Sequence, residues 1–232
     1  MKFWKRFLIF CILAVLSVLT LVIGNGYTVY QKAINEMPLS EKLEQIQAKE
    51  NYTTLKEMPE IYQDAIISVE DHRFFEHKGI DIIAIGRALF NDIRTFSLKE
   101  GGSTITQQLA KNTYFTQEKK LERKIAEVFM AFEMEKAWDK DLILELYLNT
   151  SYYGEGYHTP KEAARGYFGK EPQEMTKNET VLLAGIPNAP SAYAPTKNFR
   201  LAKERQKQVL SKMVRYGKLT EAEAERIVKG EE

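Results

Sequence analysis

The feature that most constrains this chain is an uncharged apolar run near its N-terminus. Phe7 to Ile23 is seventeen residues long, follows three basic residues and lies between Trp4 and Tyr27. A helix of about 20 apolar residues crosses a bilayer, and Trp and Tyr are enriched at the two membrane interfaces. Because the basic residues precede the run, they predict a cytoplasmic N-terminus and an extracellular C-terminal domain. We therefore expect a single-pass protein of the cell membrane.

A cleaved signal peptide is the competing interpretation, because the run is short for a membrane span. The segment 21–26, however, offers no small-x-small cleavage site, so we favour an uncleaved anchor. We assign residues 1–27 to a cytoplasmic tip and transmembrane anchor. Residues 28–58 are polar and weakly helical and are expected to form a stalk, and residues 59–232 are expected to form one globular domain.

The composition narrows the choice of partners. The formal net charge of the 232 residues is +1, which gives no global argument for nucleic acid, and we expect no nucleic-acid partner. Cys11, the single cysteine, lies in the apolar run, so a disulfide framework is excluded.

The domain is predicted to be mostly α-helical. Asp139 can cap a helix over 142–148, and Thr176 with Glu179 forms a capping box before another. No alternating strand pattern of useful length occurs. A basic helix face near the C-terminus is expected to be solvated; it consists of Lys203, Arg205, Lys207, Lys212 and Arg215.

The stretch from Glu70 to Asp81 is unusually dense in chemistry. It holds four acidic residues, two of the three histidines and two adjacent phenylalanines, directly after an apolar helical segment that begins at Ile61. At a helix C-terminus beside Asp71, both the helix dipole and the neighbouring charge disfavour an ionised Glu70. Such a pattern is typical of a catalytic general base, although a structural acidic cluster produces it as well.

A second candidate segment follows a Gly-Gly hinge. Ser103 is a good N-cap for a helix that starts at Thr104, and Thr104, Gln108 and Lys111 then share one polar stripe. An ordinary amphipathic helix has the same pattern.

A third candidate segment is the predicted helix 121–137. Its apolar face is expected to consist of Leu121, Ile125, Val128, Phe129 and Phe132. Glu127 points away from that face, among Met130, Ala131 and Met134, which suggests a carboxylate half-buried in a cleft with Arg123 and Lys124 in reach. A routine helical salt bridge is the alternative.

The segment from Ile82 to Phe96 has apolar residues on more than one helical face. Two interpretations stay open at this point. It is either a buried helix or a hydrophobic lobe that dips into the outer leaflet of the membrane.

Together these stretches resemble the peptidoglycan glycosyltransferase family (glycosyltransferase family 51), the lysozyme-like domain of class A penicillin-binding proteins and monofunctional transglycosylases. The resemblance is carried by residues 70–79, 101–112, 123–127, 143–149, 163–170, 182–187 and 189–191. It implies a two-lobed helical domain. Because no Ser-x-x-Lys or Lys-Thr-Gly motif occurs and the chain ends early, we expect the monofunctional type. The loop 156–160 departs from the Gly-Ile-rich sequence usual in the family.

By resemblance, Glu70 is the general base and Glu127 is the second essential glutamate. The resemblance also implies binding or bracing roles for Asp71, Phe74, His77, Thr104, Gln108, Lys111, Asn112, Arg123 and Lys124. It implies no required cofactor, and it allows a divalent ion, Mg²⁺ or Mn²⁺, at the pyrophosphate beside Glu127.

The implied reaction is polymerisation of lipid II into glycan strands in a bacterial cell wall, by inverting glycosyl transfer with release of polyprenyl pyrophosphate. The implied partners are lipid II, the growing glycan strand, the bilayer and other proteins of cell-wall synthesis. The alternative function is glycan cleavage by a lysozyme-like enzyme or lytic transglycosylase, and a non-catalytic membrane-anchored scaffold is a third.

Overall fold

The computed structural model describes residues 2–95, 101–116 and 120–231. Its α-helices in chain order are α1 (Lys2–Glu36), α2 (Leu39–Gln47), α3 (Glu60–Glu70), α4 (Ile82–Thr95), α5 (Ile105–Tyr114), α6 (Leu121–Ala137), α7 (Lys140–Leu148), α8 (Pro160–Phe168), α9 (Lys177–Gly185), α10 (Pro190–Tyr193), α11 (Pro195–Arg215) and α12 (Glu221–Lys229). Across these described ranges there is no β-strand, only an isolated bridge between Lys78 and Ile80. The prediction of a mostly α-helical fold is therefore confirmed.

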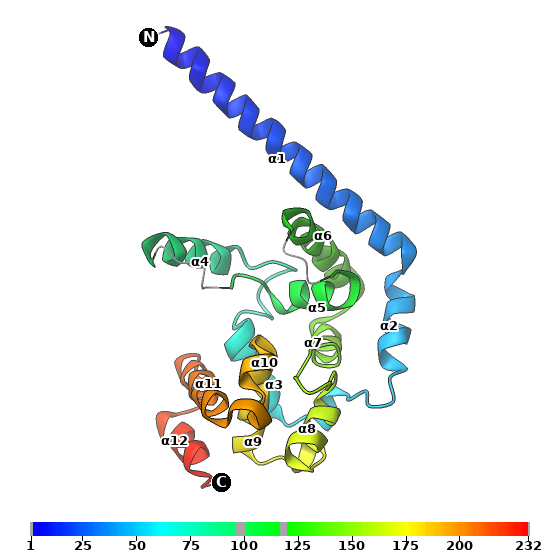
Figure 1. The fold of residues 1–232 in the computed structure, drawn as a ribbon, viewed down its shortest axis with the longest axis vertical. Coiled ribbons are helices and arrows are strands. Elements are labelled where there is room, and N and C mark those ends of the chain that lie inside the picture. The colour runs from blue at the N-terminus through cyan, green and yellow to red at the C-terminus, as the bar shows by residue number, and fades with distance from the viewer. Residues whose placement is uncertain (1, 96–100, 117–119, 232) are drawn as a thin grey trace.

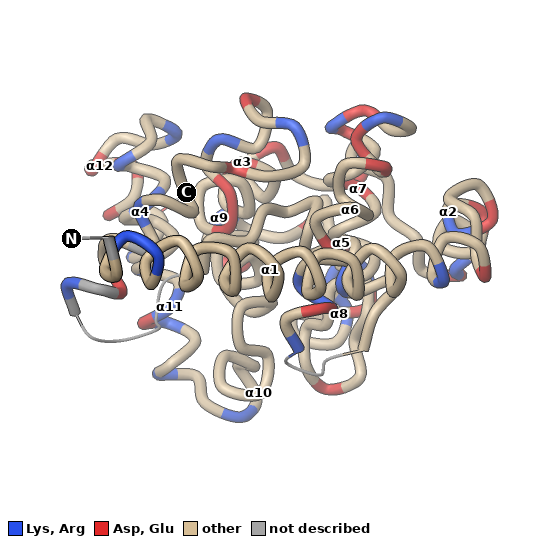
Figure 2. The backbone as a smooth tube through the Cα atoms, turned by 90° about the horizontal axis from the view of Figure 1, so that it is seen from above, with Lys and Arg blue, Asp and Glu red and all other residues tan. Residues whose placement is uncertain are grey.

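Helix α1 fits the predicted membrane anchor. It is 35 residues long, which corresponds to about 50 Å, and it projects away from the other helices (Figure 1). Within the described residues it is the one helix long and apolar enough to cross a membrane. In Figure 2, basic residues lie at the N-terminal end of α1 and are followed along the helix by a long uncharged stretch. Because α1 continues to Glu36, its last turns extend beyond the apolar run of Phe7 to Ile23.

The C-terminal part of α1 packs on α6. Gly26 permits the close approach, because a Cβ atom there would lie 2.6 Å from Cβ of Ile125. The rings of Tyr27 and Tyr30 contact Phe129, with centroid distances of 5.2 and 5.9 Å. The beginning of the predicted stalk thus lies against the domain, and the domain boundaries stay a prediction.

The remaining helices form two groups (Figure 1). In one group, α5 contacts both α6 and α7. In the other, α3 contacts α9 and α11, and α11 also contacts α10 and α12. Helix α3 lies deep in the core, since Tyr62 and Ile66 are fully buried, and its last two residues, Val69 and Glu70, line a cavity. The core therefore holds the end of α3 in a fixed position beside α5.

The faces of α6 differ from the expectation. The side that carries Glu127, Met130, Ala131 and Met134 is fully or almost fully buried, and α6 contacts α5. The opposite side, predicted as the apolar face, packs in part on α1, and Leu121 on it is 62% exposed. The helix thus has a partner on each side, and Glu127 is more buried than expected, because periodicity does not reveal which helices cover a face.

Helix α4 is not a buried helix. Ile82, Ile83 and Phe90 are 74%, 63% and 65% exposed, and Ala88 is buried. Phe96, the end of the predicted lobe, lies outside the described residues. Of the two interpretations of this segment, the exposed apolar face is consistent with a membrane-contacting lobe.

Candidate active site

Glu70 is the last residue of α3, as predicted, and its side chain is 8% exposed. Its two carboxylate oxygens have different surroundings. Oε2 accepts a hydrogen bond of 3.0 Å from Nε2 of Gln108. Oε1 lies 3.6 Å from a guanidinium nitrogen of Arg205, and no group among the described residues donates a hydrogen bond to it. One oxygen is thus positioned by α5, while the other is left with hydrogen-bonding capacity.

Asp71 ties the end of α3 to the start of α5. Its Oδ2 is 2.8 Å from Nε2 of His77 and accepts a hydrogen bond of 3.0 Å from the backbone N–H of Ile105. Phe74 is fully buried, with the ammonium group of Lys140 4.4 Å from its ring centroid. These contacts brace the loop after Glu70, and the bracing role inferred from the resemblance stays a prediction.

Helix α5 begins one residue later than predicted. Its N-cap is Thr104, whose hydroxyl accepts from the N–H of Gln107 and donates a 2.7 Å hydrogen bond to the carbonyl of Gly79. Thr104 is 1% exposed, so this hydroxyl serves the local fold, and its predicted role in substrate binding is untested. Ser103, predicted as the cap, instead accepts a 2.5 Å hydrogen bond from Nζ of Lys124. Both residues suit a cap by type, and the extended backbone of Thr104 decides between them.

Two cavities meet at α5. The first, of about 570 Å³, is lined by Val69, Glu70, Arg87, Asn91, Gly101, Ser103, Gln108, Lys111, Pro187, Asn188, Arg205, Lys212, Arg215 and Tyr216. The second, of about 630 Å³, is lined by Gln108, Lys111, Asn112, Tyr147, Ser151, Tyr152, Gly156, His158, Pro187, Asn188 and Pro190. They share four residues, so Gln108 and Lys111 stand where the two cavities join. The polar stripe predicted on α5 therefore faces a cleft at these two positions.

The second glutamate is more enclosed than predicted. Glu127 is 1% exposed, and each of its oxygens is paired with a cation of its own helix: Oε2 with Nζ of Lys124 at 2.9 Å, and Oε1 with Arg123. These three residues do not line either cavity beside α5. Ser103, which lines the first cavity, connects them to it through its hydrogen bond with Lys124.

The cations influence one another. Burial lowers the pKa of Lys111, and the nearby charge of Arg123 lowers it further, whereas the charge of Glu70 raises it. Burial, with the charges of Arg123 and Lys111, lowers the pKa of Lys124 to about 8. Lys111 thus lies within electrostatic range of both glutamate environments, which supports the predicted convergence of the two ends of the site.

The sequence interpretation missed the contribution of α11. Arg205, Lys212 and Arg215 were expected to be solvated, but all three line the cavity of Glu70, and Arg205 is only 11% exposed. A Cβ atom at Gly185 would lie 2.9 Å from Cγ of Arg205, so the glycine makes room for the arginine. A signal was present, because Arg205 and Lys212 flank the buried Val209 at helical spacing.

The donor set does not fit a protein-held metal ion. In the part of the chain that the structure describes, no three His, Cys, Asp or Glu side chains gather as metal ligands. Both oxygens of Glu127 already pair with cations, which a divalent ion would have to displace.

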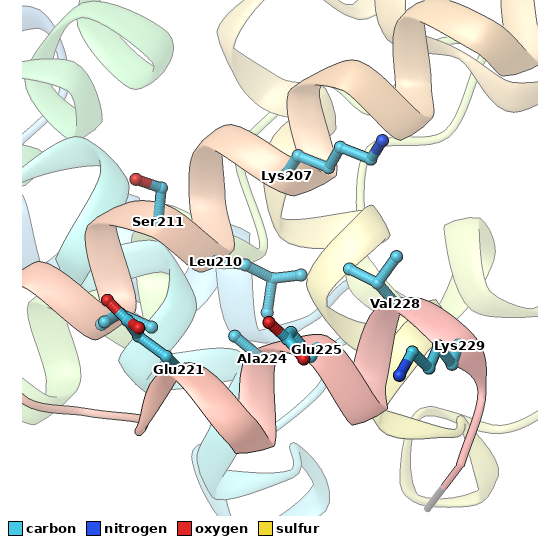
Figure 3. A pocket seen from close by; sticks show the side chains of 9 residues that line it. Lys207, Leu210, Ser211, Glu221, Ala224, Glu225, Val228 and Lys229 are labelled. Carbon is cyan, nitrogen blue, oxygen red and sulfur yellow. The ribbon is translucent and has the colours of Figure 1, made fainter.

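A third cavity, of about 390 Å³, lies between α11 and α12 (Figure 3). Leu210, Ala224 and Val228 line it together with charged residues such as Lys207 and Glu225. It shares no lining residue with the two cavities beside α5 and is therefore separate from the candidate site.

Comparison with known proteins identifies the family. The family model described as Transglycosylase matches residues 35–214. Penicillin-binding protein 1F of Bacillus subtilis (strain 168) is 43% identical over 171 residues, which cover 74% of this chain and 24% of that protein. Penicillin-binding protein 1A of Neisseria lactamica is 42% identical over 166 residues, which cover 72% and 21%. This chain thus spans less than a quarter of the length of these relatives.

Among solved structures, the crystal structure of penicillin-binding protein 1A from Haemophilus influenzae is similar to this chain with a TM-score of 0.44 and 21% sequence identity. The match covers 77% of this chain and 17% of that one.

Proposed function

This chain belongs to the transglycosylase family, and from that premise we propose that it is a peptidoglycan glycosyltransferase that polymerises lipid II. Lipid II is a disaccharide-pentapeptide carried on a polyprenyl pyrophosphate. The donor is the growing glycan, still attached to its lipid pyrophosphate, and the acceptor is a lipid II molecule.

The observation that carries this proposal is that Glu70 and Lys111 line one cavity together with Gln108, which donates a hydrogen bond to Glu70. Glu70 takes the proton of the acceptor 4-hydroxyl while the hydroxyl oxygen attacks the anomeric carbon of the donor. The new C–O bond forms as the bond to pyrophosphate breaks, and the anomeric configuration inverts. The bonding electrons leave with the pyrophosphate.

The departing pyrophosphate needs positive charge rather than a proton donor. Lys111 lines the cavity, and Lys124 donates a hydrogen bond to Ser103, which also lines it. Arg123 pairs with the same glutamate as Lys124 does. Preorganised cations stabilise charge that develops in a transition state. Glu127 pairs with both Arg123 and Lys124 and is well placed to orient them. We therefore assign Glu127 a positioning role rather than an acid role.

A divalent ion is not needed for this scheme. Since the protein offers no ligand cluster within its described residues, Mg²⁺ or Mn²⁺ would be held mainly by the pyrophosphate oxygens. No step of the mechanism is assigned to it.

Helices α1 and α4 support a position of the catalytic domain at the membrane surface. The anchor keeps the cleft next to the bilayer, and the exposed Ile82, Ile83 and Phe90 offer a second apolar contact. The basic residues before the span favour an extracellular domain. In this position the lipid tail stays in the bilayer while the sugars enter the cavities. Contacts with other proteins of cell-wall synthesis remain a prediction.

Glycan cleavage is the rival function. Its leaving group is a sugar hydroxyl, which has no need of the cations around Lys111, so the cluster favours transfer from a pyrophosphate.

Incubation of the full chain in detergent with lipid II, and separately with finished peptidoglycan, distinguishes the two functions. We expect glycan polymer from lipid II and no soluble fragments from peptidoglycan. Fragments without polymer would favour the cleaving enzyme, and binding of lipid II without turnover would favour a scaffold.

A further inference from the structure

The C-terminal end of α11 lies against the end of α3, which carries the proposed base. The ring of Tyr216, the residue that follows α11, stacks on the ring of His72, two residues after Glu70. The ring centroids are 4.1 Å apart, and the planes are inclined by only 12°. Both residues are partly buried, and together with Glu70 they line a small polar cavity of about 70 Å³. Two rings from distant parts of the sequence thus meet beside the base.

Two cations of α11 lie next to Tyr216. Arg215 and Lys212 both line the cavity of Glu70. The guanidinium carbon of Arg215 is 5.9 Å from the ring centroid of Tyr216, a distance at which a cation is attracted to an aromatic face. Nζ of Lys212 donates a hydrogen bond of 3.4 Å to the carbonyl of Val69. The position of this helix end therefore determines where the two positive charges lie relative to Glu70.

The turn after α11 has its own contacts. Gly217 has a φ angle of 72°, a left-handed conformation that favours glycine. The backbone N–H of Lys218 donates to the carbonyl of Met213 at 2.8 Å, and Nζ of Lys218 pairs with Asp64 of α3 at 2.6 Å. Because Met213 is fully buried, the turn is anchored in the core without the aromatic stack. Removal of one ring should therefore loosen the helix end without unfolding the domain.

The charge of His72 fits a contact between two neutral rings. Burial is the largest influence on its pKa and lowers it from the ordinary 6.5. The charges of Arg87 and Arg73 lower this pKa as well, whereas those of Asp81 and Asp71 raise it. At neutral pH the imidazole is therefore uncharged and adds no cation to the cavity. The catalytic scheme gives no role to this ring or to the one on which it stacks.

We propose that the stacked rings of Tyr216 and His72 fasten the end of α11 to the end of α3. Both are positioning residues, which set Lys212 and Arg215 beside Glu70. The inference rests on the proposed function, because these positive charges line the cavity in which we place the anionic, lipid-linked substrate. The stack acts on substrate binding rather than on proton removal, since a hydrogen bond from α5 holds Glu70 separately.

Single variants separate the rings from their other contacts. Tyr216→Ala and His72→Ala are each expected to lower kcat/KM for lipid II by roughly three- to tenfold, the size of one aromatic contact. The loss should lie in KM, with kcat within about twofold of the unchanged chain, because Glu70 and Lys111 are intact. Tyr216→Phe and His72→Phe keep a ring at each position and should restore KM. A loss in Tyr216→Phe as large as that in Tyr216→Ala would overturn the inference.

A matched control and a double variant sharpen the test. Phe199 on α11 also lies beside a cation, with Nζ of Lys203 5.9 Å from its ring centroid, but it is 61% exposed and lines neither cavity beside α5. Phe199→Ala should therefore leave KM unchanged. The double variant of Tyr216→Ala with His72→Ala should lose no more than the larger single loss, because either change already removes the stack. Losses that multiply would show independent roles and overturn the inference.

Hydrogen exchange tests the link without turnover. Backbone exchange of the full chain in detergent is followed by mass spectrometry, with residues 62–67 of the buried α3 as the check of folding. We expect faster exchange over both 70–76 and 212–218 in Tyr216→Ala and in His72→Ala, and normal exchange in Tyr216→Phe and Phe199→Ala. Unchanged exchange in both alanine variants of the stack would overturn the inference. The expected exchange pattern in a chain that does not consume lipid II would contradict the proposed function instead.

Discussion

The two ends of the site each hold an enclosed glutamate, but the surroundings of the two carboxylates differ. Glu127 is 1% exposed, and both of its oxygens pair with cations of its own helix. Glu70 is 8% exposed, receives one amide hydrogen bond from α5, and has an ion-pair partner, Arg205, on a distant helix. The carboxylate of Glu127 is held by its ion-pair partners, whereas that of Glu70 keeps an oxygen to which no described group donates a hydrogen bond.

This difference shows how two glutamates of one site can have different roles. A general base must lie beside the substrate proton, and Glu70 lines the cavity in which we place the substrate. A carboxylate that pairs with two cations is better suited to fix their positions, and this is the arrangement around Glu127. The following predictions test this contrast, from the largest expected effect to the smallest.

Glu70→Gln is expected to reduce lipid II polymerisation by about 10²- to 10⁴-fold, because the amide cannot take the proton from the 4-hydroxyl of the acceptor lipid II. The variant should fold normally, since Gln108 can still contact the side chain. Polymerisation assays together with thermal unfolding check both parts. Full activity in this variant would remove Glu70 from the role of base.

Glu127→Gln is expected to act on stability as well as on activity. Removal of the anion deletes one ion-pair partner of Arg123 and of Lys124, and we expect a loss of roughly 2 kcal/mol in the free energy of unfolding and about a tenfold loss of activity. Chemical denaturation monitored by circular dichroism measures the first effect. A variant as stable as Glu70→Gln would contradict the contrast between the two carboxylates.

Arg205→Gln is expected to lower kcat/KM about tenfold, because the guanidinium near Oε1 helps to orient Glu70. Arg205→Lys keeps the charge and should restore part of the rate. Arg200→Gln is the matched control, since Arg200 is 77% exposed on the same helix. An unchanged kcat/KM in Arg205→Gln would show that Arg205 only packs against Gly185.

The pH dependence of kcat/KM should reveal the deprotonation of Lys124. Its pKa of about 8, against an ordinary value of 10.5, means that it loses its proton as the pH rises through about 8. The site then has one cation fewer, and kcat/KM should fall a few-fold. Lys124→Arg keeps the charge and should move this fall to higher pH; the same alkaline limb in both proteins would exclude Lys124 as its source.

Stability should show the opposite trend over that range. Between about pH 8 and 10.5 the unfolded chain binds more protons at Lys124 than the folded chain does. The contribution of this group to the free energy of unfolding therefore rises with pH across that window.

Local features of the fold were predictable from the sequence. The end of α3 at Glu70, the Asp139 cap and the capping box of Thr176 with Glu179 all appear where their sequence signals lie. These features depend on residues within a turn or two of each other, which a helical pattern reveals. The error of one residue at the start of α5 arose because Ser103 and Thr104 are both suitable caps.

Long-range packing was not predictable. The burial of Glu127 depends on how α6 is covered by α5 and α1, and the approach of Arg205 to Glu70 depends on Gly185 in another helix. A single helix shows which residues share a face, but it does not show which face another helix will cover. For the same reason, the two ends of the site could be inferred separately, and their relation required the structure.

The most direct test of the account is the affinity for the pyrophosphate product, because it separates the base from the cations. Polyprenyl pyrophosphate in detergent micelles is titrated calorimetrically into the unchanged chain, Glu70→Gln and Lys111→Gln. We expect Glu70→Gln to bind within about twofold of the unchanged chain, and Lys111→Gln to bind at least about tenfold more weakly, because it loses a charged hydrogen-bond donor. Equal losses in both variants, or normal binding by Lys111→Gln, would contradict the assignment of proton removal to Glu70 and of pyrophosphate binding to the cations.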